Sequence, residues 1–242
     1  MSAKPRMFVY SLLLLQSTGG AISGAASAQD SPARPPAPSL IRAEGPVRPV
    51  DARGFIRRWL VLEPIGASGP LTESAVEAAL QSASLSGPLT ALPRDGDVVQ
   101  KAGALRWHAV DTKGFNLNLY HFAWALSKPT SNVLFWVVTV VDAPVELHDV
   151  RLAIGSNAAS HWWLNGASVI AIYGDRQTVI DDGVSKRLTL HKGSNVIRAA
   201  IVNGGGATDF CARFLDAEDR PISALSVSLQ AEPGGVPGRS AL

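Results

Sequence analysis

SHWWLNGASV, residues 160–169, places two adjacent tryptophans directly before an Asn-Gly pair. Asn and Gly both tolerate the positive φ angles of a type I′ turn, so Asn165-Gly166 is a strong hairpin signal. Side chains alternate between the two faces of a strand, and Trp162 and Trp163 must therefore point to opposite sides. We expect residues 161–166 to be a strand with its turn and residues 167–173 to be the returning strand. One tryptophan should enter a core, while the other should face outward or lie under a neighbouring loop.

Short apolar segments with a period of two recur on both sides of this hairpin. Residues 132–142 form a nearly continuous apolar run rich in β-branched side chains, which favours a strand covered on both faces. Many short strands, separated by Gly, Asn, Asp and Pro, indicate an all-β sandwich. One short helix is expected over residues 71–81, with Ser74 and Glu77 as a capping box. Residues 120–126 fit either a strand end or a one-turn helix.

The N-terminal residues 1–28 have the pattern of a secretory signal peptide. Lys4 and Arg6 form a basic start, a short apolar core follows, and Ala26-Ser27-Ala28 offers a cleavage site. An uncleaved anchor is the alternative, although the apolar run is shorter than the roughly 20 residues that a membrane-spanning helix needs. Cleavage would make the protein secreted or periplasmic, with no membrane insertion afterwards.

The rest of the chain divides by composition into three parts. Residues 29–53 are rich in Pro and Ala and predict a linker or N-terminal arm, residues 54–230 carry the strand pattern of the sandwich, and residues 231–242 predict a flexible tail. Cys211 is the single cysteine, so an intramolecular disulfide is impossible. Its apolar neighbours favour a buried, unreactive side chain.

The charge balance argues against nucleic acid or an anionic membrane as the partner. Without Lys4 and Arg6 the 22 basic residues fall by two and match the 20 acidic residues. A chain of near-zero net charge creates no long-range field that would attract phosphate groups. The remaining partner classes are a glycan or another exported protein.

No catalytic motif stands out in the sequence. The segment 66–70 (GASGP) ends in Pro where a nucleophile elbow needs Gly, and no metal-binding or phosphate-binding motif occurs. The five histidines lie on five different predicted segments, and the adjacent Asp181 and Asp182 suit a turn. We therefore expect a non-catalytic protein, although residues from separate loops can converge in a folded enzyme.

The second half of the chain resembles the galactose-binding-like β-sandwich, a jelly-roll module of secreted, carbohydrate-related bacterial proteins. The resemblance rests on Trp163-Leu164-Asn165-Gly166, on Arg176 in the following loop, on the turn at 190–195 and on the strand at 210–216, and it covers residues 150–222. It implies a sandwich in which Lys192-Gly193 forms a tight turn bridged by Asn195. The family often holds a structural calcium ion. No local spacing here resembles a calcium loop, so no metal ligand is assigned and no cofactor is required.

The resemblance favours an exported module that binds a glycan without catalysis. A structural or protein–protein interaction module of the cell envelope is the alternative, and a carbohydrate-active enzyme is a third. The loop after the hairpin offers Tyr173, Asp175 and Arg176 as an aromatic platform, an acceptor and a donor for sugar hydroxyls. The alternative is ordinary turn chemistry, with Gly174-Asp175 turning the chain and Arg176 paired to a nearby acid, because exposed pairs of this kind are common. Trp163 and His161 are the second set of candidate ligand-binding residues.

Overall fold

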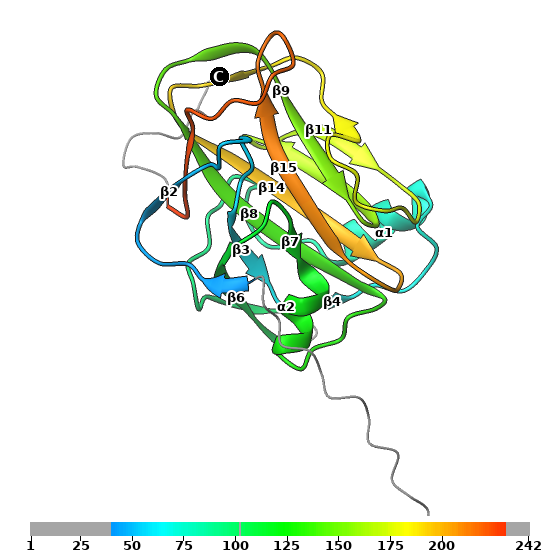
Figure 1. Cartoon of the computed structure of the whole chain (residues 1–242). Helices are drawn as coiled ribbons and strands as arrows, with labels where there is room; N and C mark the ends of the chain where they lie inside the picture. The colour runs from blue at the N-terminus through cyan, green and yellow to red at the C-terminus, as the bar shows by residue number, and fades with distance from the viewer. Residues whose placement is uncertain (1–39, 102, 231–242) are drawn as a thin grey trace, which may run out of the picture. The chain divides into compact units, whose positions relative to one another are not determined.

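The computed structural model describes residues 40–101 and 103–230, which form two packed antiparallel sheets (Figure 1). The predicted all-β sandwich is confirmed. The predicted signal peptide, residues 1–28, and the predicted tail, residues 231–242, lie outside the described residues. Within the described part of the chain, no helix is both long enough and apolar enough to cross a membrane.

The larger sheet follows the order β1-β6-β3-β8-β14-β10-β11, with four short strands paired beside this path. Its main strands are β1 (Leu40–Arg42), β6 (Ala104–Thr112), β3 (Arg58–Leu62), β8 (Val133–Ala143), β14 (Gly193–Asn203), β10 (Ala159–Leu164) and β11 (Ala167–Ile172). The additional strands are β2 (Val47–Pro49), β4 (Ile65–Gly66), β5 (Val98–Gln100) and β16 (Ser226–Ser228). β8 and β14 pair along their whole length and form the centre of the sheet (Figure 1).

The smaller sheet follows the order β12-β9-β15-β7, and β13 also pairs with β9. Its strands are β7 (Leu117–Asn118), β9 (Leu147–Ser156), β12 (Gly183–Val184), β13 (Leu188–Leu190) and β15 (Asp209–Leu215). The main core lies between the two sheets. Trp59, Trp162 and Phe210 are fully buried there and meet edge-to-face, with ring centroids 5.0 to 6.2 Å apart. The interior tryptophan of the quoted stretch is therefore Trp162.

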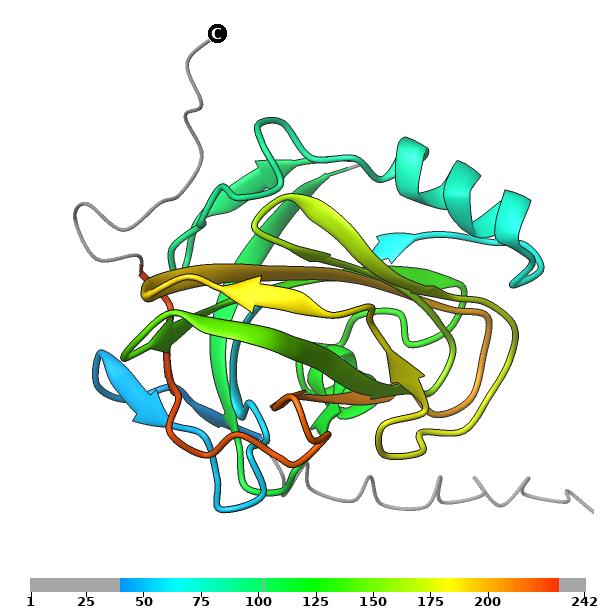
Figure 2. The same ribbon diagram turned by 90° about the horizontal axis from the view of Figure 1, so that it is seen from above.

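A second apolar cluster covers the opposite face of the larger sheet. The helix α1 (Glu73–Ser82) lies on that side, away from the smaller sheet, as Figure 2 shows. Val76 and Leu80 of α1 pack against this face, and the Trp136 indole donates its Nε1–H to the Ala83 carbonyl at 3.0 Å. β8 is thus covered on both faces, which confirms the interpretation of its continuous apolar run.

Two details of the predicted helices need correction. The N-cap of α1 is Thr72, whose side chain makes no capping hydrogen bond, and the predicted Ser74–Glu77 capping box is wrong because Glu77 instead faces strand β10. The ambiguous segment forms a second helix, α2 (Leu119–Ala125), so the prediction of a single helix was incomplete. The Asn118 side chain caps α2 by accepting the His121 amide hydrogen at 2.7 Å.

The sandwich also begins earlier than residue 54. β1 pairs with β6 and β2 pairs with β16, so part of the predicted linker belongs to the larger sheet. Arg48 in β2 reaches Asp111 at 3.2 Å, and Asp111 also binds the buried Arg58 at 2.9 Å. This buried charge network fastens the segment to the sheet, a contact that the Pro-rich composition of the segment gave no reason to expect.

The Asn-Gly hairpin turn has the geometry that the sequence predicts. Asn165 and Gly166 have φ angles of 50° and 87°. The Asn165 side chain accepts the Val196 amide hydrogen at 2.8 Å and donates to Asn195 Oδ1 at 3.0 Å. Asn195 donates to the His191 carbonyl at 2.7 Å, across the Lys192-Gly193 turn as expected. A hydrogen bond between Asn165 and Asn195 therefore joins the Asn165-Gly166 turn to the Lys192-Gly193 turn.

Candidate functional site

The larger sheet carries a groove on its outer face, beside α1 and the loop that follows it. Trp136 of β8, Arg198 of β14 and Trp163 of β10 form its floor, and the cavity has a volume of about 220 Å³. In the pairing of β14 with β10, Arg198 lies opposite Trp163. Ala200 of β14 lies opposite His161 on β10 and opposite Trp136 on β8. The small Ala200 side chain leaves the space in which the large rings meet.

Trp163 packs between two other aromatic rings on this face of the sheet. His161 and Trp163, two residues apart on β10, lie 4.2 Å apart with almost parallel planes, and Trp136 is 5.7 Å from Trp163. Trp163 is half-buried, whereas Trp162 is fully buried in the sandwich. The expectation that one of the two tryptophans enters the core is confirmed, and the other lies on the outer face of the sheet, partly covered. Trp163 is the aromatic ring of this pair that a ligand in the groove would touch.

Glu77 of α1 anchors the helix to the edge of the groove. Its Oε1 accepts the Tyr173 hydroxyl hydrogen at 3.0 Å and lies 3.1 Å from His161 Nδ1, while His161 Nε2 lies 2.7 Å from the Ser168 hydroxyl. Burial, followed by the nearby Glu77 carboxylate, raises the pKa of Tyr173 to about 12. Tyr173 therefore remains a neutral phenol that donates to Glu77, and both ring nitrogens of His161 have partners.

The structure separates the residues of the predicted loop site. Arg176 forms an ion pair with Asp182, and Asp175 is exposed, whereas Tyr173 turns towards Glu77. Tyr173 is thus linked through Glu77 to His161, another of the candidate residues. The ion pair between Arg176 and Asp182 agrees with the alternative given for this loop, in which Arg176 pairs with a nearby acid.

Arg198 is the residue of the groove that the sequence analysis missed. Its side chain is only 5% exposed, although it is an arginine on a sheet face. Nη2 donates to the Ala91 carbonyl, the guanidinium lies 6.0 Å from the Trp136 ring centroid, and Nε makes no hydrogen bond to any described residue. Burial lowers the pKa of Arg198 to about 10, so the group stays charged at neutral pH. Its position within the apolar run NVIRAAIV, residues 195–202, was the available signal.

The carboxylate of Glu63 and the thiol of Cys211 are both engaged by their surroundings within the fold. Glu63 binds Lys128 at 2.9 Å and His108 at 3.2 Å beside a mainly apolar cavity of about 510 Å³. Cys211 is buried, as expected, and burial raises the pKa of its thiol to about 11. In the part of the chain covered by the structure, no group of three or more His, Cys, Asp or Glu side chains is placed to hold a metal ion.

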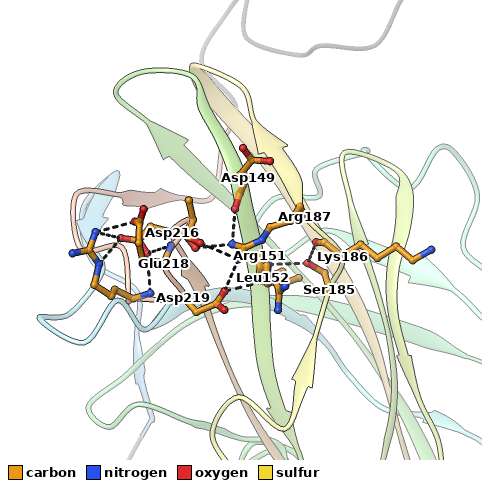
Figure 3. Close-up of polar contacts among 11 residues, drawn as sticks. Asp149, Arg151, Leu152, Ser185, Lys186, Arg187, Asp216, Glu218 and Asp219 are labelled. Carbon is orange, nitrogen blue, oxygen red and sulfur yellow. Dashed lines mark hydrogen bonds and ion pairs between the residues drawn. The ribbon is translucent and has the colours of Figure 1, made fainter.

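A charged cluster at another part of the surface is held together by contacts among its own residues (Figure 3). Arg187 donates to the backbone carbonyls of Asp149 and Asp216 at 2.8 and 2.9 Å and lies 3.2 Å from the Asp219 carboxylate. Asp216 accepts the Glu218 amide hydrogen at 3.0 Å. These contacts tie the turn after β15 to the segment before β13. They serve the fold, and the groove remains the candidate site.

No family model matches the chain, and no curated protein matches it. Among solved structures, it is similar to a PA14 sugar-binding domain from an RTX adhesin, with 13% identity over 74% of this chain and 100% of that chain and a TM-score of 0.42. It is also similar to the PA14 domain of the antifreeze protein MpAFP, with 13% identity over 70% and 89% of the two chains and a TM-score of 0.41. A β-glucosidase from Kluyveromyces marxianus shares 19% identity over 65% of this chain and 16% of that chain, with a TM-score of 0.37. Because these TM-scores are low, the function must be inferred from the residues of the groove itself.

Proposed function

We propose that this protein is an exported, non-catalytic glycan-binding module of the galactose-binding-like type, with the groove over Trp163 as its binding site. The observation that carries the proposal is the half-buried Trp163 ring, held parallel to His161 at 4.2 Å on the floor of the groove. Aromatic faces pack well against the C–H faces of sugars, and a ring that is fixed before binding loses little entropy on binding. Arg198 adds a donor beside this platform.

The acids near the groove support a binding role over hydrolysis. Among the described residues that line the cavity, Glu77 is the one carboxylate, and its Oε1 already contacts Tyr173 and His161. Glycoside hydrolysis usually needs two carboxyl groups about 5 to 9.5 Å apart, on either side of the bond that is cleaved. The groove therefore provides a platform and a cation but lacks a carboxylate pair.

Affinity electrophoresis in gels containing a soluble polysaccharide tests the proposal. Xylan, galactan, polygalacturonate and alginate serve as probes, one to a gel. We expect at least one of them to retard the wild-type protein. Trp163→Ala should weaken that retention by about tenfold or more, which is the effect of losing a central aromatic contact.

Phe115→Ala is the matched control variant. Phe115 is also a half-buried aromatic residue, but it packs on Phe55, away from the groove, and should not affect retention. Unretarded migration of the wild-type protein in all four gels would contradict the proposal. Equal retention of the Trp163→Ala variant and the wild-type protein would show that binding, if it occurs, uses another surface.

A further inference from the structure

The guanidinium of Arg198 is a buried charge without a carboxylate partner among the described residues. It is 5% exposed, and its contacts within the described chain are the Ala91 carbonyl and the face of Trp136. The other buried arginine, Arg58, shows the usual solution, because Asp111 binds it through Nε and Nη2 at 2.9 and 3.0 Å. A buried charge is costly unless it is paired. Arg198 therefore stands out as a cation whose partner is missing.

Arg198 also lines two cavities at once. It lines the groove over Trp163 and the adjoining cavity of about 520 Å³ between the loop at 84–93 and strand β5. Leu85 lines both cavities as well, so they meet at this point. A ligand that stacks on Trp163 can therefore reach the guanidinium directly, because Arg198 lies opposite Trp163 in the ladder.

We infer that the groove binds an acidic glycan, in which the carboxylate of a uronic-acid unit pairs with Arg198 while a sugar ring packs on Trp163. This inference rests on the proposed function and specifies its ligand class. Of the five N–H donors of a guanidinium, contacts within the described chain use one, on Nη2. Nε is itself fully buried, so a planar carboxylate would pair with the terminal nitrogens Nη1 and Nη2, and charge-assisted hydrogen bonds of this kind are stronger than neutral ones.

The surroundings of Arg198 support an anionic group over a neutral one. Asp97, the acid that lines the adjoining cavity, already accepts the Arg94 amide hydrogen through Oδ2 at 2.7 Å. The sequence supplies 22 basic and 20 acidic residues, so a general positive field does not explain attraction of an anion. Recognition of the anion would depend on the buried guanidinium of Arg198. Binding should therefore be specific for the position of the carboxylate on the sugar.

Isothermal titration with matched acidic and neutral ligands tests the inference. The probes are oligosaccharides from polygalacturonate and from alginate, each used as the free acid and as its methyl ester, at about 0.15 M salt to screen long-range attraction. We expect the wild-type protein to bind one free acid about tenfold or more tightly than its ester. Arg198→Met should remove this preference, so that the free acid binds no more tightly than its ester.

Arg220→Met is the control for loss of one positive charge. Arg220 is exposed, pairs with Asp216 and Glu218, and lies outside the groove, so the acid preference should persist in this variant. If Arg198→Met does not fold, Arg198→Lys and the comparison of acid with ester in the wild-type protein still test the inference. Lysine keeps the charge but loses the fork, and it should retain only part of the preference.

The possible results separate this inference from the proposed function. Equal binding of acid and ester by the wild-type protein would overturn the inference while leaving a glycan-binding module. Tighter binding of dextran sulfate than of either free acid would overturn the assignment of a carboxylate. Retention by xylan or galactan without binding of any acidic probe would also overturn the inference alone. Failure to bind all of the probes, acidic and neutral, would contradict both proposals.

Discussion

Replacement of each tryptophan of the quoted pair by alanine should have very different effects on stability. Trp162 is fully buried, meets Trp59 and Phe210 edge-to-face, and donates its Nε1–H to the buried Ser160 hydroxyl at 2.9 Å. Deleting a core tryptophan costs about 3 to 5 kcal/mol, and an unpaired buried hydroxyl adds about 1 kcal/mol. Trp162→Ala should therefore lose about 4 to 6 kcal/mol of the free energy of unfolding.

Trp163→Ala removes a ring that is half-buried and contacts Trp136 and His161 on the outer face of the sheet. Its loss should cost about 1 to 2 kcal/mol, because less apolar surface is removed from water at this position. Equilibrium denaturation in urea, monitored by far-UV circular dichroism, measures both values. A domain of ordinary stability has about 5 to 15 kcal/mol in total, so Trp162→Ala can be largely unfolded in buffer. A Trp163→Ala variant that is as destabilised as Trp162→Ala would refute the assignment of core and groove.

Two other expectations follow from the charge network at Glu63 and from the N-terminus. Burial opposes ionisation of Glu63, but hydrogen bonds and charge from Lys128 and His108 outweigh burial and lower the pKa of Glu63. The ionised carboxylate therefore stabilises the fold above its unfolded pKa of about 4.3, and this stabilisation is lost as the pH falls through the lower folded pKa. Glu63→Gln should thus flatten the loss of stability below about pH 4.3, and an unchanged acid profile in urea titrations would contradict this account. N-terminal sequencing of the exported protein should begin near Gln29, and a sequence that still starts at Met1 would rule out cleavage.

Several elements of the fold could be predicted because they depend on local sequence. Asn165-Gly166 determines its turn through the φ angles that these two residues accept, and the period of two places Trp162 and Trp163 on opposite faces. The apolar run of β8 likewise predicts burial on both faces. Each of these properties involves neighbouring residues in one segment, so the sequence alone determined them.

The composition of the groove depends on contacts between distant segments, and only the tertiary structure decided it. Glu77 looked like part of a helix cap, but it meets His161 and Tyr173, which lie 84 and 96 residues further along the chain. The loop containing Arg176 looked like a site, but its arginine pairs with Asp182. Arg198 is one charge in an apolar strand, and it was not singled out in the sequence analysis. The pairing of β14 with β8 and β10, which are distant in the sequence, places it beside two tryptophans and, among the described residues, without a carboxylate partner.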